Sequence, residues 1–219
     1  MSARGEASQH SNRADGDDAF EVDPLEDPIA DPIGRFRELY AEVSRDAPFD
    51  PTAMTLATVD GAGRPSARIV LLKAVDERGF SFFTNYRSRK GRELEANPRA
   101  ALCLYWPWAD RQVRVEGKVE RLPEPESDAY FATRPLDSQL GAWASEQSAP
   151  LDSRAALLAR AAATGAKHLG RKVPRPAHWG GFLVRPERVE FWSARPSRLH
   201  ERLVYSRNGE AWTVERLQP

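Results

Sequence analysis

Residues 52–75 read TAMTLATVDGAGRPSARIVLLKAV, and this stretch predicts the architecture of the chain. Residues 52–59 and 66–75 are rich in β-branched and apolar side chains, while the segment between them contains aspartate, glycine and proline. Such a pattern predicts two strands joined by a hairpin-type turn. A second pair of predicted strands, 100–106 and 111–122, follows with its own turn. The sequence therefore predicts an antiparallel sheet.

Further strands and helices are predicted on both sides of these hairpins. Strands are expected at 80–84, 181–184, 188–192, 202–206 and 211–216. Helices are expected from Pro32, where Asp31 is placed to cap the first turn, and at 89–96, 124–133, 136–145 and 153–168. Strands and helices do not alternate regularly, which argues against a Rossmann sheet. We expect a mainly β, α+β fold: a small antiparallel barrel with peripheral helices.

Composition excludes several classes of protein. The chain has 219 residues, and its 32 basic and 32 acidic residues cancel, so no overall field would steer it onto nucleic acid. No apolar run approaches the ~18 residues of a membrane span. The single cysteine, Cys103, excludes an intrachain disulfide and a thiolate-only metal site. The first ten residues lack an apolar signal core, which predicts a cytoplasmic protein. We expect residues 1–23 to form a disordered tail and residues 24–219 to form one domain.

Two basic segments are candidate anion sites. Arg68 and Lys73 lie five positions apart on a predicted strand, so they should project to opposite faces and serve two different anions. The alternative is an edge strand with solvated ends. Ser88 precedes Arg89 and Lys90 at a predicted helix start, where backbone N–H groups and cations together can cradle a phosphate. The alternative there is a solvated basic face.

Two later segments group residues that can bind an anion. Tyr130, Arg134 and Ser138 are four residues apart and would share one face of a continuous helix, although Pro135 is expected to bend it. The second group, Arg198, His200 and Arg202, would share one face of an extended chain; the alternative is a salt-bridged strand, because Glu201 is adjacent.

Six motifs, taken in order, resemble the flavin-dependent pyridoxamine 5'-phosphate oxidases. They are RIVLLK (68–73), FFTNYRSRKGRELEANPRAAL (82–102), RQVRVEGKVERL (111–122), YFATRPLDSQLGAWASEQS (130–148), PRPAHWGGF (174–182) and the block from FW to RLHER (191–202). The resemblance implies a homodimeric split barrel with FMN at the subunit interface. It also implies oxidation of pyridoxamine or pyridoxine 5'-phosphate by O2 to pyridoxal 5'-phosphate and H2O2, in vitamin B6 biosynthesis and salvage.

The resemblance also implies a role for particular residues. The FMN-binding residues would be Arg68, Ile69, Val70, Leu71, Leu72, Lys73, Phe83, Thr84, Arg89, Lys90, Gln112, Gln147, Ser148, Trp192 and Arg202. The substrate-binding residues would be Lys73, Tyr130, Arg134, Ser138, Arg198, Leu199 and His200, of which Arg198 and His200 would be catalytic. No metal, nucleic acid or membrane partner is expected.

The chain departs from the family pattern in two places. Residues 17–31 do not match the segment that covers the active site in many members, and Phe83 stands where a tyrosine is common. Three rival interpretations remain: a split-barrel flavin reductase or deazaflavin-dependent enzyme, a non-enzymatic flavin or pyridoxal-phosphate carrier, and a nucleic-acid binder that uses residues 87–92.

Overall fold

A computed structural model describes residues 31–219. The predicted tail, residues 1–23, lies outside the described residues, and the 24–219 domain boundary stays a prediction. Five α-helices occur in the described part: α1 (Pro32–Ser44), α2 (Arg89–Ala96), α3 (Glu124–Thr133), α4 (Leu136–Ala144) and α5 (Arg154–Lys167). The four helices with two predicted ends match to within one residue at each end, and α1 begins at Pro32 as predicted.

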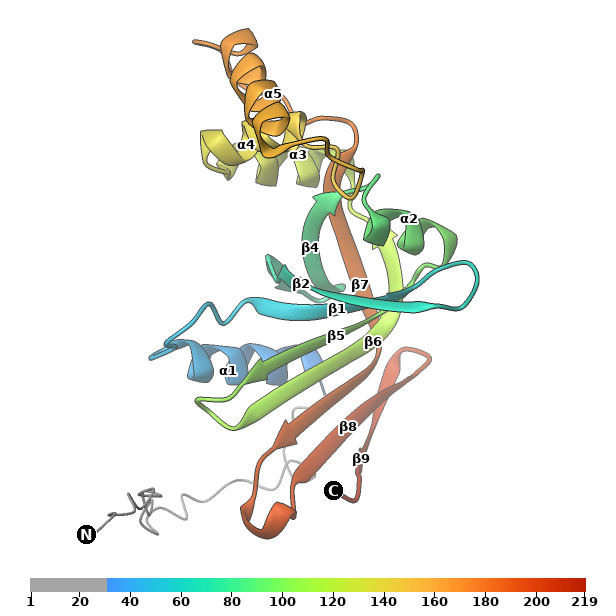
Figure 1. The fold of residues 1–219 in the computed structure, drawn as a ribbon. Coiled ribbons are helices and arrows are strands. Elements are labelled where there is room, and N and C mark those ends of the chain that lie inside the picture. The colour runs from blue at the N-terminus through green and yellow to red at the C-terminus, as the bar shows by residue number, and fades with distance from the viewer. Residues whose placement is uncertain (1–30) are drawn as a thin grey trace, which may run out of the picture.

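The strands form one antiparallel sheet that curls into a half-barrel (Figure 1). They are β1 (Ala53–Val59), β2 (Pro65–Leu71), β3 (Ala74–Asp76), β4 (Gly79–Asn85), β5 (Arg99–Trp106), β6 (Arg111–Arg121), β7 (Trp179–Ser193), β8 (Glu201–Asn208) and β9 (Ala211–Arg216). The order is β2-β1-β5-β6-β7-β4-β3, and β8 and β9 extend from β7. This arrangement confirms the predicted mainly β fold with peripheral helices.

The prediction of one strand over residues 66–75 is wrong, because the chain changes its pairing partner there. β2 pairs with β1, whereas β3 pairs with β4. At the change, the Leu72 N–H donates to Thr52 O, and the Lys73 N–H donates to Ser81 O. The Leu72 side chain is buried in the core at this point. The chain therefore carries the next residues across to a different part of the sheet.

The two strands predicted at 181–184 and 188–192 are one long strand, β7. The pairing of β6 with β7 shifts register between Glu116 and Gly117, a β-bulge that keeps the two strands paired around Pro186. A Cβ atom on Gly117 would lie 1.9 Å from the Arg185 carbonyl oxygen, so only glycine fits. The bulge explains how β7 stays continuous although its sequence contains a proline.

The core lies inside the curl of the sheet, with α1 packed against it. In β1 every second residue is buried, as expected for a strand with one face in the core. From α1, Phe36 packs edge-to-face on Phe80 with ring centroids 4.9 Å apart, and it also contacts Trp106. At one end of the sheet, α3, α4 and α5 gather beyond β4 and the start of β7 (Figure 1).

Candidate functional site

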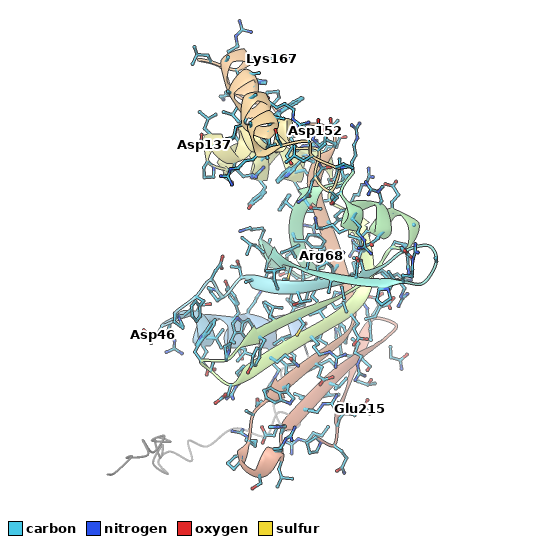
Figure 2. All side chains as sticks on the ribbon, in the orientation of Figure 1. Asp46, Arg68, Asp137, Asp152, Lys167 and Glu215 are labelled. Carbon is cyan, nitrogen blue, oxygen red and sulfur yellow. The ribbon has the colours of Figure 1, made fainter. Side chains whose placement is uncertain are left out.

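A cavity of about 1060 Å³ opens between β2, β4, α2 and the α3–α4 region. Its lining includes five cationic side chains, Arg68, Lys73, Arg89, Lys90 and Arg134, and no carboxylate among the described residues. Figure 2 shows Arg68 at the strands of this region and Asp137 and Asp152 with the helices across from it. A cavity with this balance of charge is suited to ligands that carry more than one negative charge.

The prediction that Arg68 and Lys73 project to opposite faces of one strand is wrong, whereas their service of two different anions stays a prediction. Because β2 ends at Leu71, Lys73 does not continue its alternation, and both cations line the same cavity. Ile69, Val70 and Leu71 line it as well. Leu72 does not, because its side chain is part of the core.

The start of α2 forms one end of the cavity. As predicted, Ser88 caps the helix, and its hydroxyl accepts a hydrogen bond from the Gly91 N–H. The buried Lys90 ammonium lies 3.3 Å from the Thr84 and Ser88 hydroxyls and from the Gln147 amide oxygen. Burial, together with the nearby charge of Arg68, lowers the pKa of Lys90. No carboxylate of the described residues forms an ion pair with Lys90, so its charge is available to a bound anion.

Below this end lies a buried carboxylate that the sequence analysis missed. Glu93, only 5% exposed, accepts hydrogen bonds from the Thr58 and Ser66 hydroxyls at 2.5 and 2.7 Å. It also accepts from Arg89 Nε at 2.8 Å and Arg68 Nη2 at 3.1 Å. Burial opposes ionisation, but these four hydrogen bonds outweigh it and lower the pKa of Glu93 from 4.5 to about 2. The spacing of Arg89 and Glu93, four apart on a helix, is the one sequence signal for this pair.

The lowered pKa of Glu93 predicts an acid-dependent loss of stability. A carboxylate whose pKa is lower in the folded state stabilises the protein above its unfolded pKa and loses that effect as the pH falls. The stabilisation by Glu93 should thus be complete above about pH 4.5 and decline toward about pH 2. Urea unfolding at several pH values checks this, with Glu93→Gln as the comparison. The difference between the two proteins should shrink on acidification, and a constant difference would contradict the prediction.

The opposite end of the cavity carries aromatic rings and Arg134. Phe83 and Tyr130 stack with ring centroids 3.9 Å apart, and the Arg134 guanidinium lies 4.5 Å from the Trp179 ring centroid. Burial raises the pKa of Tyr130 and lowers that of Arg134. The Arg134 Nη1 atom is buried without a hydrogen-bond partner in the described part of the chain. A half-buried cation with a buried, unused donor atom beside a cavity is suited to an anionic ligand.

Tyr130, Arg134 and Ser138 do not share one continuous helix. α3 ends at Thr133 and α4 begins at Leu136, so the bend expected at Pro135 is confirmed. All three side chains nevertheless line the cavity, together with Thr84, Gln147 and Ser148. The bend turns residues from two helices toward one space.

The remaining predicted site residues do not line this cavity. Gln112, Trp192 and Arg202 face one another across β6, β7 and β8, and Arg198, Leu199 and His200 lie in the adjoining turn. From Trp179, which lines the cavity, to Trp192 the strand β7 runs for about 40 Å at the usual rise per residue. Figure 1 shows β7 running from the helices α3–α5 to the end that bears β8. We call this second set the β8 group.

The predicted extended alternation of Arg198, His200 and Arg202 is wrong. Pro196–Arg198 form a short 3-10 turn, and both Ser197 (φ 57°) and Arg198 (φ 61°) adopt left-handed backbone conformations. Residues other than glycine, asparagine and aspartate seldom adopt this conformation, and such strain often occurs at functional sites. The turn presents Arg198 separately from the strand that holds Arg202.

Hydrogen bonds orient His200 and Arg202 in the β8 group. The Arg195 N–H donates to His200 Nδ1 at 3.2 Å, so a neutral His200 ring carries its proton on Nε2. The His200 ring also lies 4.8 Å from that of Trp192. Arg202 forms two hydrogen bonds with the buried Glu190, at 2.9 and 3.2 Å, whereas the adjacent Glu201 pairs with Arg195. His200 can therefore offer a hydrogen-bond donor to a ligand at Nε2.

Residues 31–219 contain neither a membrane-spanning helix nor a cluster of metal-ligating side chains. No described helix has the length and apolar character required to cross a membrane. Over the same residues, no three His, Cys, Asp or Glu side chains gather closely enough to hold a metal ion.

Two family descriptions match the chain. "Pyridoxamine 5'-phosphate oxidase" matches residues 40–168, and "Pyridoxine 5'-phosphate oxidase C-terminal dimerisation region" matches residues 179–219. Two curated relatives are named "Pyridoxine/pyridoxamine 5'-phosphate oxidase". The one from Anaeromyxobacter dehalogenans is 56% identical over 86% of this chain and 96% of its own. The one from Rubrobacter xylanophilus is 58% identical over 86% and 87% of the two chains.

Solved structures also resemble the chain. PhzG from Burkholderia lata, crystallised with tetrahydrophenazine-1-carboxylic acid, superposes with a TM-score of 0.84 at 37% identity, covering 88% of this chain and 95% of its own. An FMN-binding, pyridoxamine 5'-phosphate oxidase-related protein from Nostoc punctiforme has a TM-score of 0.70 at 20% identity, covering 86% and 98%. The second likeness supports the fold alone.

Proposed function

The chain belongs to the pyridoxamine 5'-phosphate oxidase family, and we propose that it uses FMN and O2 to convert pyridoxamine or pyridoxine 5'-phosphate to pyridoxal 5'-phosphate. Oxidation of the alcohol gives the aldehyde and H2O2. Oxidation of the amine gives an imine and H2O2, and water then releases ammonia to leave the same aldehyde. The observation that carries this proposal is the cavity with five cations and no carboxylate among its described lining residues.

The residues at the two ends of the cavity fit two phosphate groups. Arg68, Arg89 and Lys90 would hold the FMN phosphate, with Gln147 and Ser148 assisting. At the other end, the substrate phosphate would meet Lys73, Tyr130, Arg134 and Ser138, where the unpartnered Arg134 Nη1 supplies a buried donor. FMN, when bound, supplies the two-electron acceptor. The work of the protein is then to orient the substrate and stabilise charge.

Arg198 and His200 would complete the substrate site as charge and hydrogen-bond donors. Since His200 Nδ1 already accepts the Arg195 N–H, the neutral ring would hold the substrate through its Nε2–H rather than remove a proton there. The left-handed turn constrains the backbone at Arg198, and its exposed side chain would reach the substrate ring from there.

The distance between the cavity and the β8 group supports a homodimer with composite sites. Along one chain the two sets are separated by most of β7, a longer span than side chains can bridge. In a homodimer, the β8 group of one subunit would meet the cavity of the other. Exposed apolar side chains on the outer face of the sheet, Ile69, Leu71 and Tyr105, are available for such an interface. A dimerisation region is also the description that matches residues 179–219.

The dimer proposal predicts a definite mass. In light scattering, the active protein should have twice the 24.5 kDa mass of the chain, about 49 kDa. An active species with the mass of one chain would contradict the composite site.

Oxygen uptake, measured together with pyridoxal 5'-phosphate formation, tests the proposed activity. We expect pyridoxamine 5'-phosphate to support both and unphosphorylated pyridoxamine to be a poor substrate, because it leaves the Arg134 end of the cavity unfilled. A carrier of flavin or pyridoxal phosphate would consume no oxygen. Tetrahydrophenazine-1-carboxylic acid, the compound bound to PhzG, is the third substrate to test. Preference for it over the phosphorylated amine would overturn the proposed substrate.

A further inference from the structure

A buried carboxylate directly beneath a cavity for anions is unexpected, because its charge repels the ligand. Glu93 nevertheless accepts hydrogen bonds from two of the cations at that end, Arg68 on Oε2 and Arg89 on Oε1. We propose that Glu93 is a positioning residue that holds these two arginines ready for the phosphate of the flavin. The inference rests on the proposed function and assigns a role to a residue outside the predicted FMN and substrate contacts.

The Glu93 carboxylate holds Arg68 through two intervening hydroxyl groups as well as by a direct hydrogen bond. The Thr58 and Ser66 hydroxyls donate their protons to Glu93 Oε2, so their oxygens are left to accept from Arg68. Arg68 Nη1 donates to Thr58, and Nη2 donates to Ser66, both at 2.5 Å. Glu93 thereby sets the direction of both hydroxyls and holds the guanidinium through them as well as directly.

Arg89 is held by its Nε alone. That atom donates to Glu93 Oε1, and neither Nη atom forms a hydrogen bond within the described residues. The side chain is 60% exposed, so without Glu93 it would be disordered among many rotamers. Fixing Nε in this way leaves both terminal NH2 groups for a phosphate.

If Glu93 acted only through its charge, removing it would change the affinity for phosphate in the opposite direction from that expected for a positioning residue. Arg68, Arg89 and Lys90 with Glu93 carry a net charge of about +2, which matches a phosphate monoester near its dianionic form. Without Glu93 the local charge is about +3, so charge alone predicts tighter binding of phosphate. The positioning role predicts weaker binding, because the ordering of the arginines must then occur on binding. Whether phosphate binding becomes tighter or weaker therefore distinguishes the effect of charge from the positioning role.

Glu93→Gln is a sharp test, because glutamine has one acceptor oxygen where glutamate has two. Oε2 accepts from three donors and Oε1 from Arg89, so an amide NH2 at either position faces at least one donor. The amide can therefore satisfy only one side of the network. Glu95→Gln is the matched control: it lies on the same helix, is 66% exposed, pairs with Arg121 and does not line the cavity.

The experiment measures the binding of FMN and of riboflavin to the flavin-free full chain by quenching of flavin fluorescence. Riboflavin lacks the phosphate, so the ratio of the two affinities isolates the phosphate end. We expect Glu93→Gln to weaken FMN binding about 10-fold or more, the effect of losing a charge-assisted hydrogen bond, with riboflavin binding and the Glu95→Gln control unchanged. Unchanged or tighter FMN binding would overturn the proposal, and so would an equal loss for both flavins.

If Glu93→Gln does not fold, Ser66→Ala tests the same chain of contacts. It removes one hydroxyl between Glu93 and Arg68 and should lower the preference for FMN over riboflavin in the same direction, by about 3-fold or more. No change in that preference would overturn the proposal. A wild-type protein that binds FMN and riboflavin equally would instead show that the proposed phosphate end itself is wrong.

Discussion

Arg198→Met is expected to slow electron transfer from substrate to flavin by roughly 30- to 1000-fold while FMN binding stays nearly unchanged. A positioned cationic donor that offsets charge in the transition state contributes about 2–4 kcal/mol, which corresponds to this range of rates. The chain holds Arg198 in a left-handed conformation next to a second such residue, Ser197. The Arg195–Glu201 ion pair, at 2.8 Å, closes the same turn. This geometry constrains the backbone at Arg198, while its exposed side chain forms no hydrogen bond or ion pair within the described residues and is available to a substrate.

Anaerobic stopped-flow measurement of the flavin absorbance would determine the effect of this substitution. Arg207→Met is a suitable control, since Arg207 lies in β8 toward the β8–β9 turn and pairs with Glu210. An Arg198→Met protein whose flavin is reduced at the wild-type rate would contradict a catalytic role for Arg198. His200 would then be the first candidate for that role.

Arg134→Leu should raise KM for pyridoxamine 5'-phosphate about 10- to 100-fold without loss of FMN. A charge-assisted hydrogen bond contributes about 1.5–3 kcal/mol, which accounts for that factor. Arg134 Nη1 is buried without a partner in the described residues, so a substrate phosphate would satisfy it. Unphosphorylated pyridoxamine should respond little to the substitution, because it lacks the group that Arg134 would contact.

The competing explanation gives Arg134 a purely structural role. In that case the contact that matters would be the packing of the guanidinium over the Trp179 ring, 4.5 Å from its centroid. If this packing were its whole role, Arg134→Leu would lower the melting temperature and impair both substrates alike. Kinetics with both substrates and a melting curve for each protein separate the two results.

Local patterns in the sequence predicted the parts of the site that depend on neighbouring residues. Ser88 caps α2 as expected, and the bend at Pro135 separates α3 from α4. Turn and cap residues act on backbone within a few positions of themselves, so their effect can be predicted without knowledge of the fold. The break between β2 and β3 at Leu72–Lys73 could not be predicted in this way, because it depends on which distant strand each residue pairs with.

The buried network around Glu93 illustrates the same limit. Its pairing with Arg89 is visible as a spacing of four on a helix, but Thr58 and Ser66 come from two other strands. The turn before β8 was missed for a different reason. An alternating pattern of polar residues predicts a strand, and nothing in that alternation reveals left-handed backbone at Ser197 and Arg198.

The absorbance of the flavin in the purified protein, recorded without oxygen, tests the proposed oxidation as a whole. The protein should bind FMN and show its visible absorption bands. Pyridoxamine 5'-phosphate should bleach those bands, and air should restore them as pyridoxal 5'-phosphate accumulates. Failure to take up FMN, or a bound flavin whose spectrum pyridoxamine 5'-phosphate leaves unchanged, would contradict the proposed function.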